Sequence, residues 1–416
     1  MIRLDARAVA LLDDGRRRYR PLKPMLEGRL KRPFRRGVQQ RILMIHADDP
    51  IAWPQFYPFF HFAERFADAG YAFRAVAYPA EGADALIAEA SAILVQSPYV
   101  PAPGELEAML ERIVRVNPTA PISYFDWFAP TDVRLAERVA DHVTYYAKKA
   151  LLRDRDYYRT PQRTHTRLCQ FYGEQYGLIS EAPYWQVRPD IVERLILAPG
   201  FVTAPRLISA FDRGPAPDFE RDRAIDLHAR FSASNQLLAQ SGQDRAGSHT
   251  HWYVAMRNAA IDSVNALAKR YRIASKGKVP ASAYMAELAD SKLCFSPFGF
   301  GELCWRDVEA MSVGSVLIKP SMSHLDCFCG IFRPGETYIP VRWDFADLEE
   351  KVAHLMAHPE ERKAIAARAF EVIQGYLAGP RLELLLKQVT RARPRGALER
   401  KRPDREVSIS TQTAAA

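Results

Sequence analysis

Apolar and polar segments alternate regularly through the first half of the chain. Short apolar runs that end at polar or turn-forming residues predict strands over 41–46, 71–78, 92–96, 121–125 and 142–147. Stretches with helical spacing of apolar residues lie between them and predict helices over 56–69, 83–91, 104–117 and 131–139. This strand–helix order predicts a parallel sheet and a Rossmann-like half. No G-x-G-x-x-G follows the first strand, which argues against a dinucleotide site there.

A second strand–helix pattern follows an irregular middle. Residues 148–190 break the rhythm and read as an insertion that is helical in part, and 195–198 is a further strand. The Pro- and Gly-containing stretch 212–220 is the best linker candidate. Beyond it, strands are predicted over 224–231, 272–275, 293–295 and 316–318, and helices over 251–271, 282–289, 345–357 and 360–376.

These patterns divide the chain into two α/β domains and two basic ends. The predicted parts are a basic N-terminal extension (1–38), an N-terminal Rossmann-like domain (39–210), a C-terminal Rossmann-like domain (211–380) and a disordered basic tail (391–416); the resemblance described below implies that the first domain binds the acceptor and the second the donor. The fold class expected is therefore α/β with two Rossmann-like domains, and a site in the cleft between them.

The rest of the chain is organised around residues 291–321. An apolar strand is followed by a turn rich in Gly and Pro, then by a helical segment that carries Arg306 and Glu309, a break at Gly314 and a second apolar strand. Ligands of open α/β sheets bind at the carboxyl ends of strands. Backbone N–H groups of a Gly-rich turn at a helix N-terminus suit phosphate. This stretch predicts a nucleotide-sugar site.

Charge and composition narrow the class of partner. The net charge is +9, but residues 16–36 hold ten Lys or Arg against one Glu, and 391–416 hold seven against three acidic residues. Residues 1–15 have a net charge of −1, which leaves −3 for 37–390. A near-neutral body argues against a nucleic-acid binder. Basic ends favour either solvated tails or peripheral contact with an anionic membrane surface.

The chain shows no targeting or disulfide signal. It has no run of 18 apolar residues, and its first 20 residues lack the apolar core of a secretory signal. Five cysteines, an odd and sparse set, indicate reduced thiols and a cytoplasmic protein, at most peripheral at the inner membrane face. Cys327 and Cys329 lie near His324, but their spacing fits no common zinc motif, so no metal site is predicted.

Residues 284–319 resemble the donor-binding part of GT-B glycosyltransferases, and most of all the exostosin-like families. The resemblance rests on Tyr284, Ser291-Lys292, the strand 293–295, Pro297-x-Gly299, Arg306-x-x-Glu309-Ala310, Gly314 and the strand 316–318. Residues 338–341 and 347–349 are also similar to the CAP10-like (KDEL-motif) glycosyltransferases. The resemblance implies two Rossmann-like domains that face each other across a cleft, a nucleotide-sugar donor, and catalysis without a metal or other cofactor.

The resemblance also implies roles for the donor-site residues. Glu309 would accept hydrogen bonds from a ribose diol, and the alternative for it is a capping or ion-pair role with Arg306. Arg306 would bind the diphosphate, for which a forked guanidinium is suited. The full set of predicted donor-binding residues is Arg230, Arg257, Lys276, Ser296, Gly299, Gly301, Glu302, Arg306 and Glu309. The chain departs from the pattern of two Glu eight apart, because Glu302 lies seven before Glu309.

An inverting transferase needs a general base for the acceptor hydroxyl. The predicted strand ends of the first half offer two carboxylates, Asp126 and Asp48, and His46 is a further candidate. Asp126 lies between Phe125 and Trp127, aromatic residues that either line a sugar or fill the core.

The sequence therefore predicts a metal-independent glycosyltransferase. It would move a sugar from a nucleotide-sugar donor to a hydroxyl of a glycan, lipid-linked or protein-linked acceptor, for instance in polysaccharide biosynthesis. Two alternatives stay open: a non-catalytic α/β binding or scaffold protein with a degenerate nucleotide site, and another nucleotide-dependent enzyme of Rossmann type.

Overall fold

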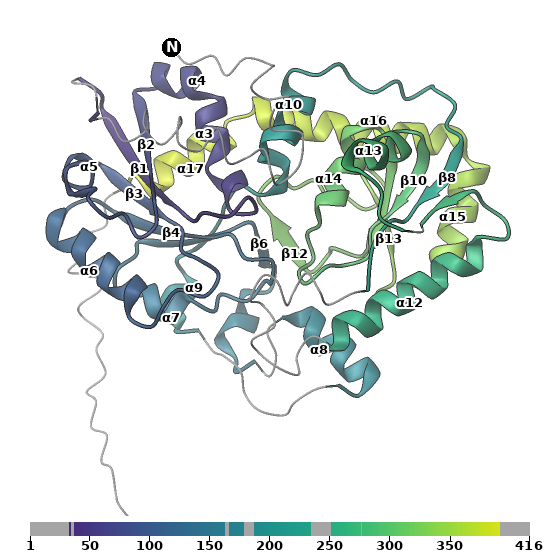
Figure 1. Cartoon of the computed structure of the whole chain (residues 1–416), viewed down its shortest axis with the longest axis horizontal. Coiled ribbons are helices and arrows are strands. Elements are labelled where there is room, and N and C mark those ends of the chain that lie inside the picture. Colours follow the sequence, from purple (N-terminus) through teal and green to yellow (C-terminus); the bar gives the residue numbers. More distant parts are fainter. Residues whose placement is uncertain are drawn as a thin grey trace, which may run out of the picture.

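The first half of the protein is built on a six-stranded parallel sheet (Figure 1). The computed structural model describes residues 33–34, 37–162, 166–178, 187–233, 251–275 and 277–391. The strands are β1 (Gln40–His46), β2 (Tyr71–Ala77), β3 (Ala92–Val95), β4 (Ile122–Asp126), β5 (Tyr145–Lys148) and β7 (Leu195–Leu197). They pair in the order β2-β1-β3-β4-β5-β7. The central strands are buried on both faces, which explains their continuous apolar runs.

The helices of this half are shorter than the sequence pattern predicts. They are η1 (Trp53–Gln55), α3 (Tyr57–His61), α4 (Ala63–Asp68), α5 (Asp84–Glu89), α6 (Glu105–Val116), α7 (Ala136–Val139), η2 (Arg155–Arg159), α8 (Arg167–Tyr176), α9 (Pro189–Val192), η3 (Phe201–Thr203) and α10 (Pro205–Asp212). The single helix predicted over 56–69 is broken at Phe62, whose backbone (φ −100°, ψ 32°) is not helical. Within 131–139, only α7 is an α-helix.

The second half contains a five-stranded parallel sheet. Its strands are β8 (Ile225–His228), β9 (Ile273–Ala274), β10 (Ser291–Phe295), β11 (Val316–Pro320) and β13 (Ile339–Val341), in the order β13-β11-β10-β8-β9. Its helices are α12 (His251–Leu267), α13 (Ala281–Ala289), α14 (Trp305–Ser312), α15 (Leu348–Ala357), α16 (Pro359–Ala378) and α17 (Arg381–Val389). The predicted α/β class with two Rossmann-like halves is confirmed.

Contacts between segments far apart in the sequence join the halves. The irregular segment predicted over 148–190 contributes β6 (Ala150–Leu152), which pairs antiparallel with β12 (Leu325–Cys327) of the second half. From α8, Tyr172 stacks on Trp252 and Trp343 and donates a 2.8 Å hydrogen bond to the Trp343 carbonyl. Finally, α17 returns to the first half (Figure 1), where its Glu383 pairs with Arg65 of α4.

The junction between the halves follows α10. This helix begins at Pro205, a residue suited to the first helical position, and it packs against α14 and α16 of the second half. The first sheet ends at Leu197 and the second begins at Ile225, so the boundary predicted between 210 and 211 stays a prediction within this connection. The predicted N-terminal extension and C-terminal tail lie almost wholly outside the described residues.

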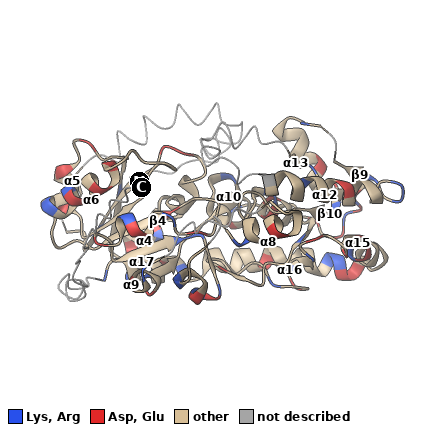
Figure 2. Ribbon diagram, turned by 90° about the horizontal axis from the view of Figure 1, so that it is seen from below, with Lys and Arg blue, Asp and Glu red and all other residues tan. Residues whose placement is uncertain are grey.

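Charged positions of both signs are interspersed over the helices (Figure 2), as the near-neutral charge of 37–390 leads one to expect. Among the described residues, no helix combines the length and the apolar character that crossing a membrane requires.

Candidate functional site

A buried ion pair between Asp307 and Lys319 holds the loop after β10 in place. Asp307, in the first turn of α14, accepts a 2.9 Å hydrogen bond from the Cys304 backbone N–H, and it pairs with Lys319 of β11 at 3.1 Å. Ser296 donates to the other Asp307 oxygen at 2.6 Å. All three polar side chains are fully buried or nearly so. Ser296 was predicted to bind donor, but its hydroxyl supports this loop from inside.

Glu309 lies one turn along α14 and already has two partners. Its carboxylate pairs with Arg206 of α10, and it accepts a 2.9 Å hydrogen bond from the Tyr284 hydroxyl of α13. The Glu309 side chain is 6% exposed and that of Arg206 is 38% exposed. The sequence alternative, an ion pair between Glu309 and Arg306, is not what the structure has. The sequence does not indicate that Arg206 pairs with Glu309, because Arg206 lies on a helix about 100 residues earlier.

Arg306 points toward the end of β8. Its guanidinium donates to the Arg230 carbonyl at 2.6 Å and lies 3.5 Å from the Ser296 hydroxyl. Arg230 itself forms a forked ion pair with Glu287 of α13, and this hydrogen bonding lowers the pKa of Glu287. The positive charge of Arg230 is therefore largely balanced within the protein.

Arg257 of α12 is the exception among the basic residues. It is 6% exposed and stands over the rings of Phe231 (5.4 Å) and Tyr253 (5.1 Å). Among the described residues no carboxylate or other hydrogen-bond acceptor is recorded for its guanidinium, and its Nε is buried without a partner. Burial lowers the pKa of Arg257. Because an uncompensated buried charge costs several kcal/mol, this guanidinium calls for an anion.

Arg257 and Arg306 share one aromatic platform. The Arg306 guanidinium lies 5.7 Å from the Phe231 ring that also carries Arg257. Gly299 lies beside them, because a Cβ built on it would stand 3.7 Å from an Arg257 nitrogen. Three predicted donor residues thus meet at the carboxyl edge of the second sheet, next to the end of β8.

Gly301, which the sequence predicts to lie beside a donor phosphate, lies against the backbone of Ala129. A Cβ on Gly301 would stand 1.9 Å from the backbone oxygen of Ala129, which belongs to the first half. The glycine is needed here for close approach between the two halves. The Ala129 carbonyl therefore fills the side of Gly301 on which a Cβ would stand, and donor binding by Gly301 stays a prediction.

Glu302 also lies between the halves. One carboxylate oxygen accepts from the Thr131 hydroxyl at 3.2 Å and lies 3.4 Å from the His324 ring. The other oxygen is buried without a partner among the described residues, as is Nδ1 of His324. Glu302 is 1% exposed, and its role in donor binding stays a prediction.

The two predicted bases differ sharply in exposure. Asp126 is fully buried: it pairs with Lys148 at 2.7 Å and accepts from the Tyr146 hydroxyl and the Phe128 N–H at 2.6 and 2.8 Å. This geometry is that of a core ion pair. Asp48, just past β1, is exposed. Lys276 lies outside the described residues.

A small, mostly apolar recess lies between the halves. Lys149 and Phe201 of the first half line one side, and Cys304 and Cys327 of the second half line another. The Lys149 amine donates to the Trp127 carbonyl at 2.9 Å and lies over the Phe201 ring. Burial, followed by repulsion from Lys148, lowers the pKa of Lys149 to about 7. The lysine was missed in the sequence, where nothing distinguishes it from a surface residue.

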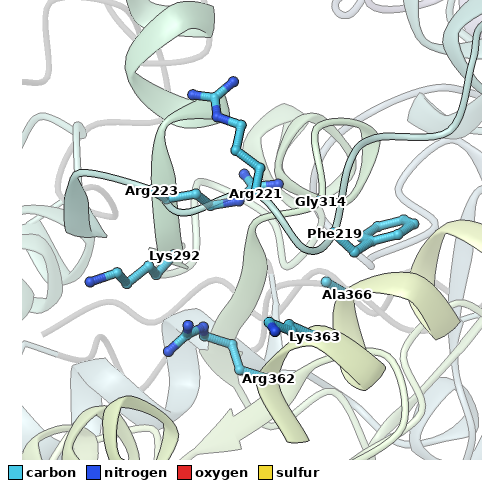
Figure 3. A pocket seen from close by; sticks show the side chains of 8 residues that line it. All are labelled: Phe219, Arg221, Arg223, Lys292, Gly314, Arg362, Lys363 and Ala366. Atoms are coloured by element: carbon cyan, nitrogen blue, oxygen red, sulfur yellow. The ribbon is translucent and has the colours of Figure 1, made fainter. Parts of the chain in front are cut away.

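A basic hollow at the opposite edge of the second sheet is a weaker candidate (Figure 3). Its lining includes Arg221, Arg223, Lys292, Arg362 and Lys363. Most of these cations already have acidic partners, since Arg221 pairs with Asp290, Lys292 with Asp226 and Lys363 with Glu220. The Arg223 guanidinium is satisfied by three backbone carbonyls. Arg257 differs from these cations because its guanidinium has neither an acidic partner nor a hydrogen-bond acceptor among the described residues.

One known protein family matches part of the second half. Residues 246–387 match the family model described as "Glycosyl transferase-like". The matched range contains Arg257, the Gly turn, Arg306 and Glu309, so this half of the protein is that of a glycosyltransferase-type enzyme. The enzyme class expected from residues 284–319 is confirmed, and the narrower exostosin-like and CAP10-like assignment stays a prediction. No curated protein matches the chain.

Several solved structures are similar in fold at low identity. An alpha-glucosyltransferase solved with UDP-glucose and abasic-site DNA is 11% identical, with a TM-score of 0.46 over 84% of this chain and 99% of its own. A glycosyltransferase from Rickettsia africae is 9% identical (TM-score 0.45; 87% and 99%). Sucrose-phosphate synthase from Thermosynechococcus elongatus is 12% identical (TM-score 0.43; 84% and 99%). These likenesses are too distant to bear on the site.

Proposed function

We propose that the protein transfers a sugar from a nucleoside-diphosphate sugar to a hydroxyl of a glycan, lipid-linked or protein-linked acceptor. The observation that carries the proposal is the buried Arg257 guanidinium, which has no acceptor among the described residues and lies at the carboxyl edge of a parallel sheet. The glycosyl transferase-like match over the same residues supports it.

In this proposal the donor diphosphate lies between Arg257 and Arg306. Both guanidiniums are held on Phe231, so their positions are set before the donor arrives. Negative charge grows on the leaving diphosphate in the transition state, and fixed cations in a buried site stabilise it. These two cations would serve without a metal, as the resemblance of residues 284–319 implies.

Glu309 would take the ribose of the donor. A ribose diol offers two hydroxyl donors to a carboxylate. To bind Glu309, the ribose must displace Arg206, whose partly exposed side chain can turn into solvent, while the partly buried Tyr284 hydroxyl keeps its hydrogen bond. Donor binding is thus coupled to release of an ion pair between α10 and α14.

The acceptor would approach from the first half. Of the two predicted bases, only Asp48 is exposed, so we propose it as the group that takes the acceptor proton. Asp126 would instead hold Lys148 and Tyr146 in the core. A cytoplasmic location, peripheral membrane contact through the basic ends, membership of the exostosin-like families and a role in polysaccharide biosynthesis belong to the same proposal.

Ligand-induced thermal stabilisation tests the donor site. A panel of UDP-, GDP- and CMP-linked sugars should raise the melting temperature with at least one member, and Glu309→Ala and Arg306→Ala should each abolish that rise. The matched controls are Arg368→Ala and Glu371→Ala, an exposed Arg and Glu with the same spacing on α16, which should keep it. A well-folded protein that responds to no nucleotide would refute the proposal.

One observation favours a non-catalytic alternative. Both oxygens of Glu309 are already engaged by the protein itself, as in a site that no longer binds donor. Incubation with labelled nucleotide sugars separates the two functions. An enzyme releases the nucleotide and gives a labelled product, whereas a binding protein returns the donor unchanged.

A further inference from the structure

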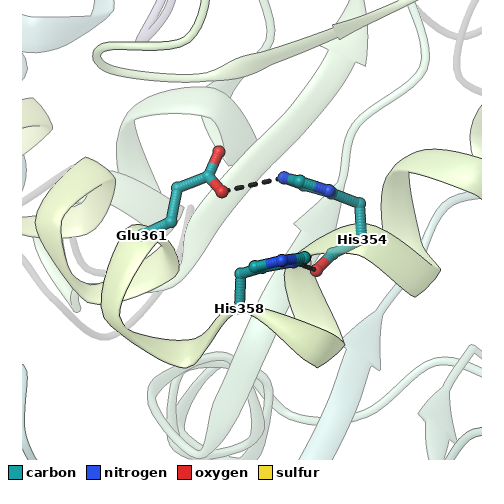
Figure 4. A group of neighbouring side chains, drawn as sticks. All are labelled: His354, His358 and Glu361. Carbon is teal, nitrogen blue, oxygen red and sulfur yellow. Dashed lines mark hydrogen bonds and ion pairs between the residues drawn. The ribbon is translucent and has the colours of Figure 1, made fainter.

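Three potential metal ligands meet where α15 gives way to α16 (Figure 4). His354 lies in the last turn of α15, His358 is the residue before α16, and Glu361 lies in the first turn of α16. One ligand atom from each lies within 4.8 Å of the others, and all three residues are exposed. The short connection between the helices brings them together.

The backbone fixes the tautomer of His358, whereas the stacked rings must turn before the lone pairs of both imidazoles can meet one cation. Nδ1 of His358 lies 2.7 Å from the His354 carbonyl oxygen, so the proton of His358 resides on Nδ1 and its Nε2 keeps the lone pair. A backbone carbonyl that fixes the tautomer in this way is a common feature around metal-binding histidines. The two rings are stacked, 4.3 Å apart at 28°.

Glu361 completes the set. Its carboxylate lies 2.8 Å from Nε2 of His354, and the two groups share one proton in a hydrogen bond. The pair is about half exposed, so this bond contributes little to stability. A divalent cation placed among the three groups would replace that proton and satisfy both the imidazole and the carboxylate.

We propose that His354, His358 and Glu361 bind a divalent transition metal of the Zn²⁺ type, which joins the end of α15 to the start of α16. Two imidazoles and one carboxylate suit Zn²⁺, Ni²⁺ or Cu²⁺, whereas Mg²⁺ and Ca²⁺ prefer oxygen ligands. Three protein ligands leave a position for water. The site is separate from the donor residues of α12 and α14, so it does not depend on the proposed function.

The test is metal binding by the full chain, prepared without a histidine tag and stripped with a chelator. Titration calorimetry with ZnCl₂ should show one saturable equivalent, and Co²⁺ should give a visible absorption band. His354→Ala and His358→Ala should each weaken binding at least about tenfold, as expected when a site loses a ligand. His142→Ala, which removes a partly exposed histidine of the first half, should leave binding unchanged.

Zinc can also bind thiols, and the experiment separates that case. Burial raises the pKa of the Cys327 and Cys329 thiols, which opposes their use as thiolate ligands. Equal affinity in wild type and in the His354→Ala/His358→Ala double variant would place the metal elsewhere and overturn the proposal, as would absence of binding to the wild type. Because the three side chains are exposed, the variants should fold normally, and circular dichroism checks this.

Discussion

At the scale of single residues, Arg257 is a side chain that we expect to favour ligand binding while it lowers the stability of the ligand-free protein. A buried guanidinium without an acceptor destabilises the ligand-free protein, and residues kept for binding often carry such a cost. We predict that Arg257→Met leaves the free energy of unfolding without ligand unchanged or raises it, by up to about 4 kcal/mol. Urea unfolding of the two proteins measures the difference.

Arg194 provides the matched control for this prediction. It is also a buried arginine, but it donates to the Ala140 and Val143 carbonyls and pairs with Asp190 at 2.7 Å. Arg194→Met should lower the free energy of unfolding by about 3 kcal/mol, because it strands buried acceptors. A comparable loss in Arg257→Met would mean that Arg257 is held by partners within the protein.

The lowered pKa of Lys149 predicts that the stability of the protein depends on pH. Its pKa is about 7 in the folded protein and about 10.4 in an unfolded chain. Between these values the unfolded state binds the extra proton, so the stability of the wild type rises with pH over this window. The penalty of burying the charge is complete below pH 7 and absent above the unfolded pKa.

Lys149→Met removes that dependence. The variant should exceed the wild type in free energy of unfolding by several kcal/mol at pH 6, since each pKa unit corresponds to about 1.4 kcal/mol. The advantage should shrink steadily toward pH 10. Urea unfolding at pH 6, 8 and 10 measures the trend, and a difference that does not change with pH would contradict the lowered pKa.

At the scale of elements, the loop between β10 and α14 belongs to both halves. The Ala129 carbonyl oxygen fills the space that a Cβ on Gly301 would need, so any Cβ there would collide with it. Gly301→Ala should therefore lower the free energy of unfolding by about 1–3 kcal/mol, the usual range for overpacking. Gly375→Ala is the control, because Gly375 lies inside α16 with open space around its Cβ position, and it should stabilise by about 0.5–1 kcal/mol. Equal effects would show that the contact with Ala129 is not tight.

Elements with strong local patterns were predictable, and those fixed by distant contacts were not. The apolar runs of β1, β3, β4, β10 and β11 identify both sheets because buried parallel strands are apolar throughout. In contrast, β6 and β12 are three-residue strands that exist only because they pair with each other. The helix α17 was missed, since its apolar face is buried only after the chain returns to the first half.

The residues of the site also divide into those that the sequence predicts and those whose partners come from distant parts of the chain. Arg257, Gly299 and Arg306 were selected from the sequence, and the structure brings them together around Phe231. The partners of Glu309 were not foreseeable, because Arg206 lies on the helix between the two sheets. Asp126 carries no sequence sign of its buried partner Lys148, which reaches it only when β4 and β5 pair.

At the scale of the whole molecule, the two halves are joined at several points around the proposed donor site. The β6–β12 pair, the Tyr172 stack and the return of α17 connect them, and the recess beside Lys149 is lined from both sides. In the proposed function the second half supplies the cations for the donor, and the first half supplies Asp48. The central claim is that a nucleoside diphosphate binds at Arg257.

Titration calorimetry with UDP and GDP measures this claim directly on the wild type and on Arg257→Met. We predict saturable binding of at least one nucleotide to the wild type and loss of that binding in the variant, while unfolding experiments show that the variant is as stable as the wild type or more so. Binding of equal affinity to both proteins would contradict the account.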